Sequence, residues 1–246
     1  MRDNVKEFVR LVTTVVPIIE PVIEIGSFQV DEQVGYADLR SFFPGKEYIG
    51  CDMRWGPGVD RIENVEHLNF ESGVVGSVLI LDTLEHVQNP IVALWEIHRV
   101  LKPGGIVVMS SVMAWPIHDY PSDYWRFTPQ SFEFLLERFE TRLVYVQGQK
   151  AFPHAIFGLG RKAGGDPEVA EAMANKLSPM NREESGFTIT TDGASVVAKS
   201  PTIVAGAAVI PILGTGIVTR SGKYYLFDRH LPARLLSGLR HRVLGT

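Results

Sequence analysis

Three acidic residues lie at or beside the ends of short apolar runs, where a nucleoside ligand would be bound. Glu24 lies near the end of residues 21–25, Asp52 follows residues 47–51, and Asp82 follows residues 78–81. Open parallel sheets bind ligands beyond the carboxyl ends of their strands. A carboxylate at the position of Asp52 accepts hydrogen bonds from both ribose hydroxyls of an adenosine. We therefore expect an adenosine site at this edge.

The turn after the first run contains one glycine, followed by larger side chains. It reads Gly26-Ser27-Phe28-Gln29-Val30-Asp31. A pyrophosphate site needs the spacing G-x-G-x-x-G, in which the backbone approaches the phosphates closely. The turn therefore argues against a nicotinamide-dependent oxidoreductase and favours an adenosine ligand without phosphates.

Two histidines have the chemistry of a general base. His118 lies in an aromatic and acidic stretch that follows residues 106–109, and His86 lies just after Asp82. The pKa of imidazole is near neutrality, so it accepts a proton at physiological pH. Such a base is needed only where the substrate group is a hydroxyl or a protonated amine. The simpler alternative for His86 is a structural hydrogen bond to a nearby carbonyl.

The stretch around His118 is also the predicted substrate site, because it lies on a loop and mixes polar groups with aromatic rings. The substrate candidates are Asp119, Tyr124, Trp125 and Arg126. The alternative is structural: the two aromatic rings anchor the loop, and Arg126 pairs with Asp119 or Asp123.

Strands alternating with helices must position these residues. The predicted strands are residues 21–25, 47–51, 78–81, 106–109, 143–146 and 155–157. Asn89-Pro90 and Thr128-Pro129 each supply a helix N-cap followed by a first-turn proline, and residues 102–105 end the first of these helices. An N-terminal helix presents one apolar face that includes Val5, Phe8, Val9 and Val12. The alternation predicts an α/β fold with a mainly parallel sheet.

Four segments together resemble the class I S-adenosylmethionine-dependent methyltransferases, nearest the type 11 branch. They are Glu24-Ile25-Gly26-Ser27, Gly50-Cys51-Asp52, Asp82-Thr83-Leu84-Glu85-His86-Val87 and the run from His98 to Gly105. The resemblance covers about residues 20–160 and implies a Rossmann-like, mainly parallel seven-stranded sheet flanked by helices. It also implies S-adenosylmethionine as the cofactor.

The resemblance implies a role for individual positions. Glu24 and Gly26, with Ser27, would line the methionine part of the cofactor, and Asp52, with Met53, would bind the ribose. The remaining implied cofactor contacts are Asn64 and Val65 beside the adenine, and Asp82, Thr83 and Leu84 near the methionine moiety and the transferable methyl. The family usually has further glycines where this chain has Phe28 and Val30.

Composition and charge exclude several classes of protein and of binding site. The chain has 246 residues, one cysteine and a formal net charge of −4. A single cysteine rules out an intrachain disulfide and a cysteine-based zinc or iron–sulfur site, and no metal site is expected. The acidic balance argues against nucleic-acid binding. Charged residues interrupt the apolar start before a secretory signal can form, which predicts a cytoplasmic protein.

The predicted methyltransferase domain spans residues 1–162, followed by a C-terminal extension at 163–246. Residues 202–219 hold no charge and nominally meet the length of a membrane span, but their glycines and proline favour a β-hairpin or a surface segment. Residues 220–246 carry a net charge of +5, against −9 for the rest. The leucines and arginines of residues 226–244 predict a basic amphipathic helix for peripheral contact with an anionic membrane or for docking on a partner. The alternative is a solvated helix.

The sequence therefore predicts methyl transfer from S-adenosylmethionine to a small-molecule, sugar or lipid-linked acceptor. The alternative is a non-catalytic scaffold with the same fold in a polysaccharide or envelope pathway.

Overall fold

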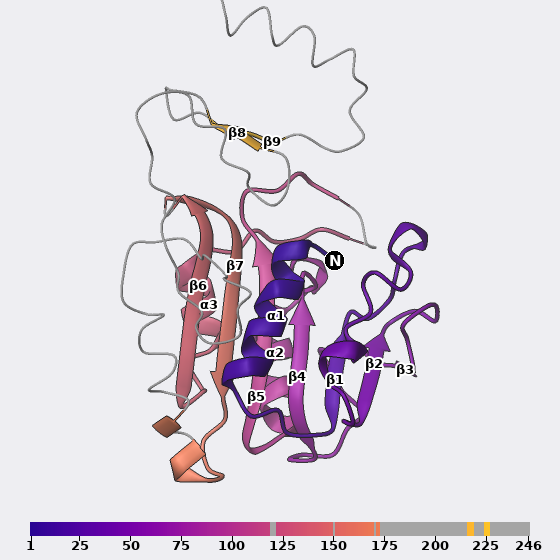
Figure 1. Cartoon of the computed structure of the whole chain (residues 1–246), viewed down its shortest axis with the longest axis vertical. Helices are drawn as coiled ribbons and strands as arrows, with labels where there is room; N and C mark the ends of the chain where they lie inside the picture. The colour runs from indigo at the N-terminus through magenta and orange to yellow at the C-terminus, as the bar shows by residue number, and fades with distance from the viewer. Residues whose placement is uncertain (119–121, 150, 170, 173–215, 219–223, 227–246) are drawn as a thin grey trace, which may run out of the picture. The chain divides into compact units, whose positions relative to one another are not determined.

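A seven-stranded mixed sheet forms the centre of the protein in the computed structural model (Figure 1). The structure describes residues 1–118, 122–149, 151–169, 171–172, 216–218 and 224–226. The strand order is β3 (Arg61–Ile62), β2 (Tyr48–Asp52), β1 (Val22–Ile25), β4 (Val75–Leu81), β5 (Leu101–Val112), β7 (Phe152–Arg161) and β6 (Thr141–Gln149). The first five strands are parallel, and β7 is antiparallel to both of its neighbours. The expected Rossmann-like, seven-stranded sheet is confirmed, but it is mixed, because β7 is antiparallel to its neighbours.

Helices in the described part of the chain that accompany this sheet include α1 (Asp3–Val15), α2 (Pro90–Val100) and α3 (Pro129–Leu135). Both predicted caps are present. The Asn89 side chain accepts a hydrogen bond from the Val92 amide at 3.2 Å, and the Thr128 side chain accepts one from the Ser131 amide at 3.2 Å. These caps satisfy amide donors that have no partner within the helix.

Alternating side chains of the central strands divide the apolar core between the two faces of the sheet. Ile80 of β4 and Val107 of β5 belong to the cluster that includes α2 and α3. Leu79 and Ile106 belong to the cluster that includes α1. A strand covered on both faces is buried along its whole length, as β4 is. Its one polar side chain, Ser77, donates to the Ile19 carbonyl at 2.8 Å. Figure 1 shows α1 crossing one face of the sheet, with α2 and α3 behind it.

The strand order reverses between β1 and β4, and this is where an open sheet binds its ligand. From β1 the chain continues outward to β2 and β3, then returns to the other side of β1 as β4. Connections that leave in opposite directions open a crevice at the carboxyl ends of the strands. The 3-10 turns that follow, η1 (Asp31–Gln33) after β1 and η3 (Leu84–His86) after β4, lie at this end.

The chain divides into two compact units, residues Met1–Lys199 and Ser200–Thr246. In the second, β8 (Gly216–Val218) pairs with β9 (Tyr224–Leu226) in antiparallel fashion. Strand β8 lies near the end of residues 202–219, the uncharged segment for which the sequence favours a hairpin or a surface segment. Among the described residues, no helix is both long and apolar enough to cross a membrane. Residues 227–246, which contain nearly all of the predicted amphipathic helix, lie outside the described residues.

Candidate functional site

An open cavity of about 1120 Å³, counted to the solvent at its mouth, lies at the carboxyl ends of β1, β2 and β4. Eight residues proposed from the sequence line it: Glu24, Gly26, Ser27, Asp52, Asp82, Thr83, His86 and His118. They come from four separate segments of the chain, which the parallel strands bring to one edge.

Glu24 is a buried carboxyl group in the wall of this cavity. The Tyr48 hydroxyl donates a hydrogen bond to its Oε2 atom at 2.6 Å. Burial raises the pKa of Glu24 to about 7, against the opposing effect of the tyrosine hydroxyl. The Ser27 hydroxyl, also in the wall, is buried and makes no hydrogen bond to any residue that the structure describes. A buried polar atom without a partner is costly unless a ligand satisfies it.

Asp52 ends β2 with its carboxylate held by the neighbouring backbone. Its Oδ1 atom accepts from the Arg54 amide at 3.0 Å, and its Oδ2 atom lies 3.4 Å from the Phe28 amide. The side chain is 13% exposed and lies at the cavity wall, so it retains access to a ligand. The Arg54 guanidinium lies 4.4 Å above the Phe28 ring and closes this end of the cavity.

Two glycines outside the first turn allow its bulky residues to fit. A β-carbon on Gly56 would lie 2.2 Å from the Phe28 ring, and one on Gly58 would lie 2.4 Å from the Ser27 carbonyl oxygen. Gly56 and Gly58 therefore allow the loop after β2 to pack directly against Phe28 and Ser27. At Gly26 itself, where φ is +83°, a β-carbon would meet the Thr83 hydroxyl at 2.2 Å.

Asp82 is paired with an arginine that the sequence did not single out. The Arg2 Nε and Nη2 atoms donate to the two Asp82 carboxylate oxygens at 2.7 and 2.6 Å. The Ser110 hydroxyl donates to the same carboxylate at 2.8 Å. Burial acts to raise the pKa of Asp82, but Arg2 outweighs burial and keeps the pKa below its usual range. Arg2 precedes α1, so the pair ties this helix to the cavity.

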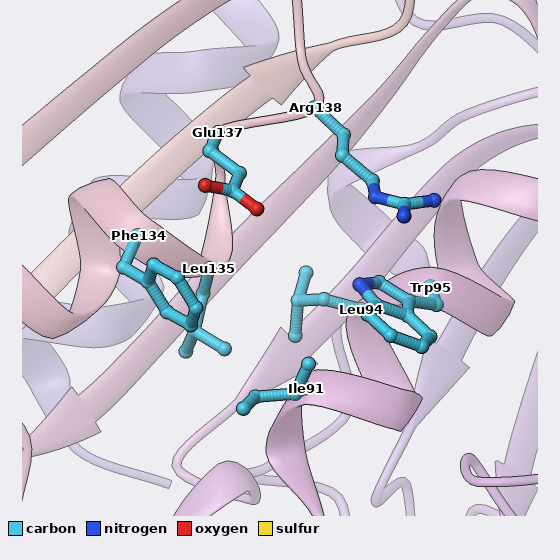
Figure 2. A pocket seen from close by; sticks show the side chains of 7 residues that line it. All are labelled: Ile91, Leu94, Trp95, Phe134, Leu135, Glu137 and Arg138. Atoms are coloured by element: carbon cyan, nitrogen blue, oxygen red, sulfur yellow. The ribbon is translucent and has the colours of Figure 1, made fainter.

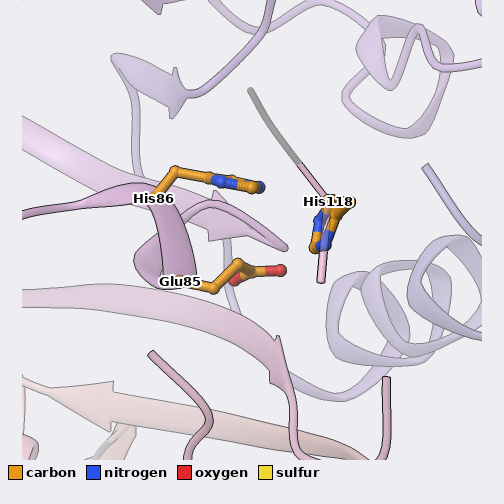
Figure 3. A group of neighbouring side chains, drawn as sticks. All are labelled: Glu85, His86 and His118. Atoms are coloured by element: carbon orange, nitrogen blue, oxygen red, sulfur yellow. The ribbon is translucent and has the colours of Figure 1, made fainter. Parts of the chain in front are cut away.

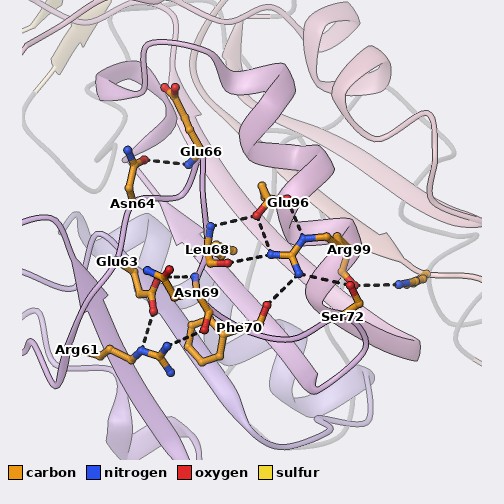
Figure 4. A network of polar contacts seen from close by, with 11 residues as sticks. Arg61, Glu63, Asn64, Glu66, Leu68, Asn69, Phe70, Ser72, Glu96 and Arg99 are labelled. Atoms are coloured by element: carbon orange, nitrogen blue, oxygen red, sulfur yellow. Dashed lines mark hydrogen bonds and ion pairs between the residues drawn. The ribbon is translucent and has the colours of Figure 1, made fainter.

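Four of the proposed cofactor residues do not line the cavity: Met53, Asn64, Val65 and Leu84. Met53 is 65% exposed, whereas Val65 and Leu84 are buried in the core. The Asn64 side-chain oxygen accepts from the Glu66 amide at 2.9 Å, within the polar network of Figure 4. There Glu63, Glu96 and Arg99 bind the backbone of residues 68–70. A turn held in this way positions Asn64 outside the cavity.

His86 and His118 lie beside each other, with Glu85 next to them (Figure 3). The two ring centroids are 4.8 Å apart at an angle of 82°. Burial lowers the pKa of His86, which favours its neutral form. Burial, with a smaller effect from Asp82, raises the pKa of Glu85 to about 7. The sequence had not identified Glu85, because its neighbours become clear only once η3 meets the loop that contains His118.

The proposed substrate residues hold their loop in place, against the turn around η3 and through contacts within the loop. The Trp125 ring nitrogen donates to the Val87 carbonyl at 2.9 Å, and the Tyr124 amide donates to the Glu85 carbonyl at 2.8 Å. Arg126 forms a bidentate ion pair with Asp123, as the structural alternative anticipated. None of these three described residues lines the cavity. Asp119 lies outside the described residues.

Trp115 and Phe28 are aromatic cavity residues that the sequence analysis had not assigned to the cofactor site.

A smaller hollow of about 260 Å³ lies between α2 and the α3 region (Figure 2). Its lining is largely apolar and includes Trp95, below the Arg138 guanidinium at 4.7 Å. It lacks the convergent polar groups of the larger cavity, which is therefore the candidate functional site.

Part of the chain is similar to known proteins. Residues 46–109 match the methyltransferase domain family, type 11. A crystal structure of a putative methyltransferase from Bacillus halodurans is 14% identical and covers 64% of this chain and 98% of its own, with a TM-score of 0.47.

Two further solved structures are similar. The Burkholderia thailandensis 1,6-didemethyltoxoflavin-N1-methyltransferase, with bound 1,6-didemethyltoxoflavin and S-adenosylhomocysteine, is 17% identical over 65% of this chain and 77% of its own (TM-score 0.47). The [4+2]-cyclase SpnF is 15% identical over 66% and 81% (TM-score 0.48). No curated protein matches the sequence.

Proposed function

Because residues 46–109 belong to the type 11 methyltransferase domain family, within a class I fold, we propose that this protein transfers a methyl group from S-adenosylmethionine to an acceptor. The observation that carries the proposal is the convergence of Glu24, Ser27 and Asp52 on one cavity at the strand-order reversal. These groups fit the cofactor chemically: a carboxylate suits the ribose hydroxyls, and a buried acidic group with an unsatisfied hydroxyl suits an amino-acid moiety.

The bound cofactor would supply an activated methyl group on a sulfonium, so the protein's task is to align the acceptor behind that methyl. Holding two reactants in line contributes about 7–11 kcal/mol to lowering the barrier in well-oriented intramolecular reactions. Here Asp52 would hold the ribose and Glu24 the amino-acid part of the cofactor, and the backbone at Gly26 would allow its close approach. Phe28 and Trp115 supply aromatic surface to the cavity walls.

We assign the removal of the acceptor's proton to one of two histidines, His86 or His118. His86 and His118 line the same cavity as the cofactor residues. His118 is the better placed of the two, because Asp123 Oδ2 lies 3.1 Å from its Nδ1 atom and orients the ring. A base of this kind supports acceptors that are hydroxyls or protonated amines. A small molecule, a sugar and a lipid-linked glycan all offer such groups.

The alternative of a non-catalytic scaffold gains no support from the comparisons. It differs from the proposed function in one respect that can be tested: a scaffold binds the cofactor but gives no methylated product.

The experiment is calorimetric binding of S-adenosylmethionine and S-adenosylhomocysteine to the full chain, to Asp52→Ala and to Asp166→Ala. Asp166 is an exposed aspartate outside the cavity lining, so its variant is the matched control. We expect micromolar binding by the wild type and control, and at least a tenfold loss in Asp52→Ala, because one good hydrogen bond to a charged group is worth about 1.5–3 kcal/mol. NADH should not bind. Equal affinities in all three proteins would contradict the proposal.

A further inference from the structure

We propose that Glu85, His86 and His118 bind a divalent first-row transition ion, with zinc as the preferred ion. Each of these residues offers one ligand atom, and these atoms all lie within 4.8 Å of one another (Figure 3). The inference goes beyond the proposed function, and it differs from the sequence expectation that the protein has no metal site. That expectation rested on cysteine content, whereas this cluster uses imidazole and carboxylate.

The His86 ring is oriented by a backbone carbonyl. Its Nδ1 atom lies 2.6 Å from the Ser122 carbonyl oxygen. A carbonyl only accepts, so Nδ1 carries the hydrogen and the lone pair of the neutral ring is on Nε2. An imidazole that donates one ring N–H to a carbonyl while the other nitrogen binds the ion is the usual arrangement around protein-bound metals.

The His118 ring is oriented by a carboxylate that is itself held in place. Its Nδ1 atom lies 3.1 Å from Asp123 Oδ2 and 3.2 Å from the Pro116 carbonyl oxygen. The Asp123 side chain is 1% exposed, accepts from the His118 amide at 2.8 Å and forms a bidentate pair with Arg126. Carboxylate–histidine–metal arrangements fix the tautomer in this way and make the ligating nitrogen more basic.

Glu85 offers the carboxylate ligand of such a site. Its side chain is buried, and the Ser111 hydroxyl donates to its Oε2 atom at 2.6 Å. Its backbone carbonyl accepts the amides of Tyr124 and Trp125, which joins the turn of His86 to the loop that follows His118. The nearby Asp82 carboxylate is paired with Arg2 and stays outside the ligand set.

Two imidazoles and one carboxylate form a ligand set that zinc enzymes use while keeping a position open for water or substrate. Zinc bonds of about 2.0–2.2 Å place tetrahedral ligand atoms about 3.3–3.6 Å apart. Donor atoms that now lie within 4.8 Å of one another would therefore approach by up to about 1.5 Å. All three residues line the cavity, so the open position would face the acceptor. An acceptor hydroxyl bound there would become more acidic, and the imidazoles would then hold the ion instead of taking the proton.

The test is zinc binding by the tag-free, chelator-treated full chain, followed by competition with a chromophoric chelator. We expect one zinc ion per chain, with an affinity at least 100-fold lower in His86→Ala and in His118→Ala. His67→Ala is the matched control, since His67 is exposed and outside the cluster. Asp123→Asn should lower the affinity about 10–100-fold, as loss of outer partners does in other sites.

Cobalt(II) titration of the wild type provides a readout that needs no variant. One equivalent should produce visible absorption bands of an imidazole-bound ion. Absence of stoichiometric zinc and of these bands would overturn the proposal, as would undiminished zinc affinity in the folded double variant His86→Ala/His118→Ala. S-adenosylhomocysteine calorimetry on the metal-free protein separates the two proposals. Cofactor binding without zinc binding refutes only the metal site, and zinc binding without cofactor binding refutes only the proposed function.

Discussion

At the scale of single residues, Glu24 connects the cavity to the pH dependence of stability. Its pKa rises from 4.5 to about 7 on folding, because the folded protein buries it. A raised pKa means that its contribution to stability is fully present below about pH 4.5 and is lost as the pH rises through about 7. A shift of this size corresponds to about 3 kcal/mol at most.

Glu24→Gln should therefore gain stability relative to the wild type between pH 5 and pH 8, by up to about 3 kcal/mol. Glutamine retains an acceptor for the Tyr48 hydroxyl and has no charge to bury. Urea denaturation at the two pH values measures the difference. Glu71→Gln, at an exposed position, is the control and should follow the wild type. If the free energy of unfolding changed equally with pH in the wild type and in Glu24→Gln, the buried carboxyl group would not titrate in this range.

The same residue scale shows where sequence reasoning about the site succeeds and where it stops. Acidic residues at strand ends could be predicted, because the apolar runs identify the strands and parallel strands end at one edge. The packing of Phe28 against Gly56 could not be predicted, because the two residues meet only once the loops after β1 and β2 are in contact. Glu85 and Arg2 were missed for a similar reason: their partners are distant in sequence, and no periodicity connects them.

At the scale of elements, helix starts were predictable and strand directions were not. Asn89-Pro90 and Thr128-Pro129 carry their caps within a few residues, so local chemistry determines where α2 and α3 begin. The antiparallel direction of β7 follows from its short connection to β6, and an apolar run alone carries no direction. The apolar run at residues 106–109 also underestimates the length of β5. The strand begins at Leu101, which pairs with Val75 before an irregularity in the register.

One ion pair joins α1 to the sheet, and its removal should be costly. Arg2→Met leaves the buried Asp82 carboxylate without its partner, which should lower the free energy of unfolding by about 3–5 kcal/mol. The pKa of Asp82 should rise in this variant, because burial then acts unopposed by Arg2. The double variant Arg2→Met/Asp82→Asn should recover part of the loss. Guanidinium denaturation measures all three proteins, and equal costs for the single and double variants would refute the coupling.

At the scale of the whole molecule, charge separates the two units. Residues 200–219 carry no charge, so Met1–Lys199 has a net charge of −9 and Ser200–Thr246 has +5. Among the described residues, those that line the candidate cavity all precede position 119. The described cavity lining and the basic charge therefore belong to different units. We propose that the two units serve separate purposes: cofactor binding in the first and contact with an anionic surface in the second.

A chain that ends at Lys199 should keep the first property and lose the second. Its affinity for S-adenosylhomocysteine should stay within about twofold of the full chain, since the lining is intact. The full chain should sediment with phosphatidylserine vesicles at low salt, because each basic residue near such a surface contributes about 1 kcal/mol. The shortened chain, with its net negative charge, should stay in solution. Neutral vesicles and high salt are the controls. High salt should release the full chain, because the screening length falls from about 10 Å at 0.1 M to about 3 Å at 1 M. Loss of cofactor binding on truncation would instead assign the second unit a part in the site.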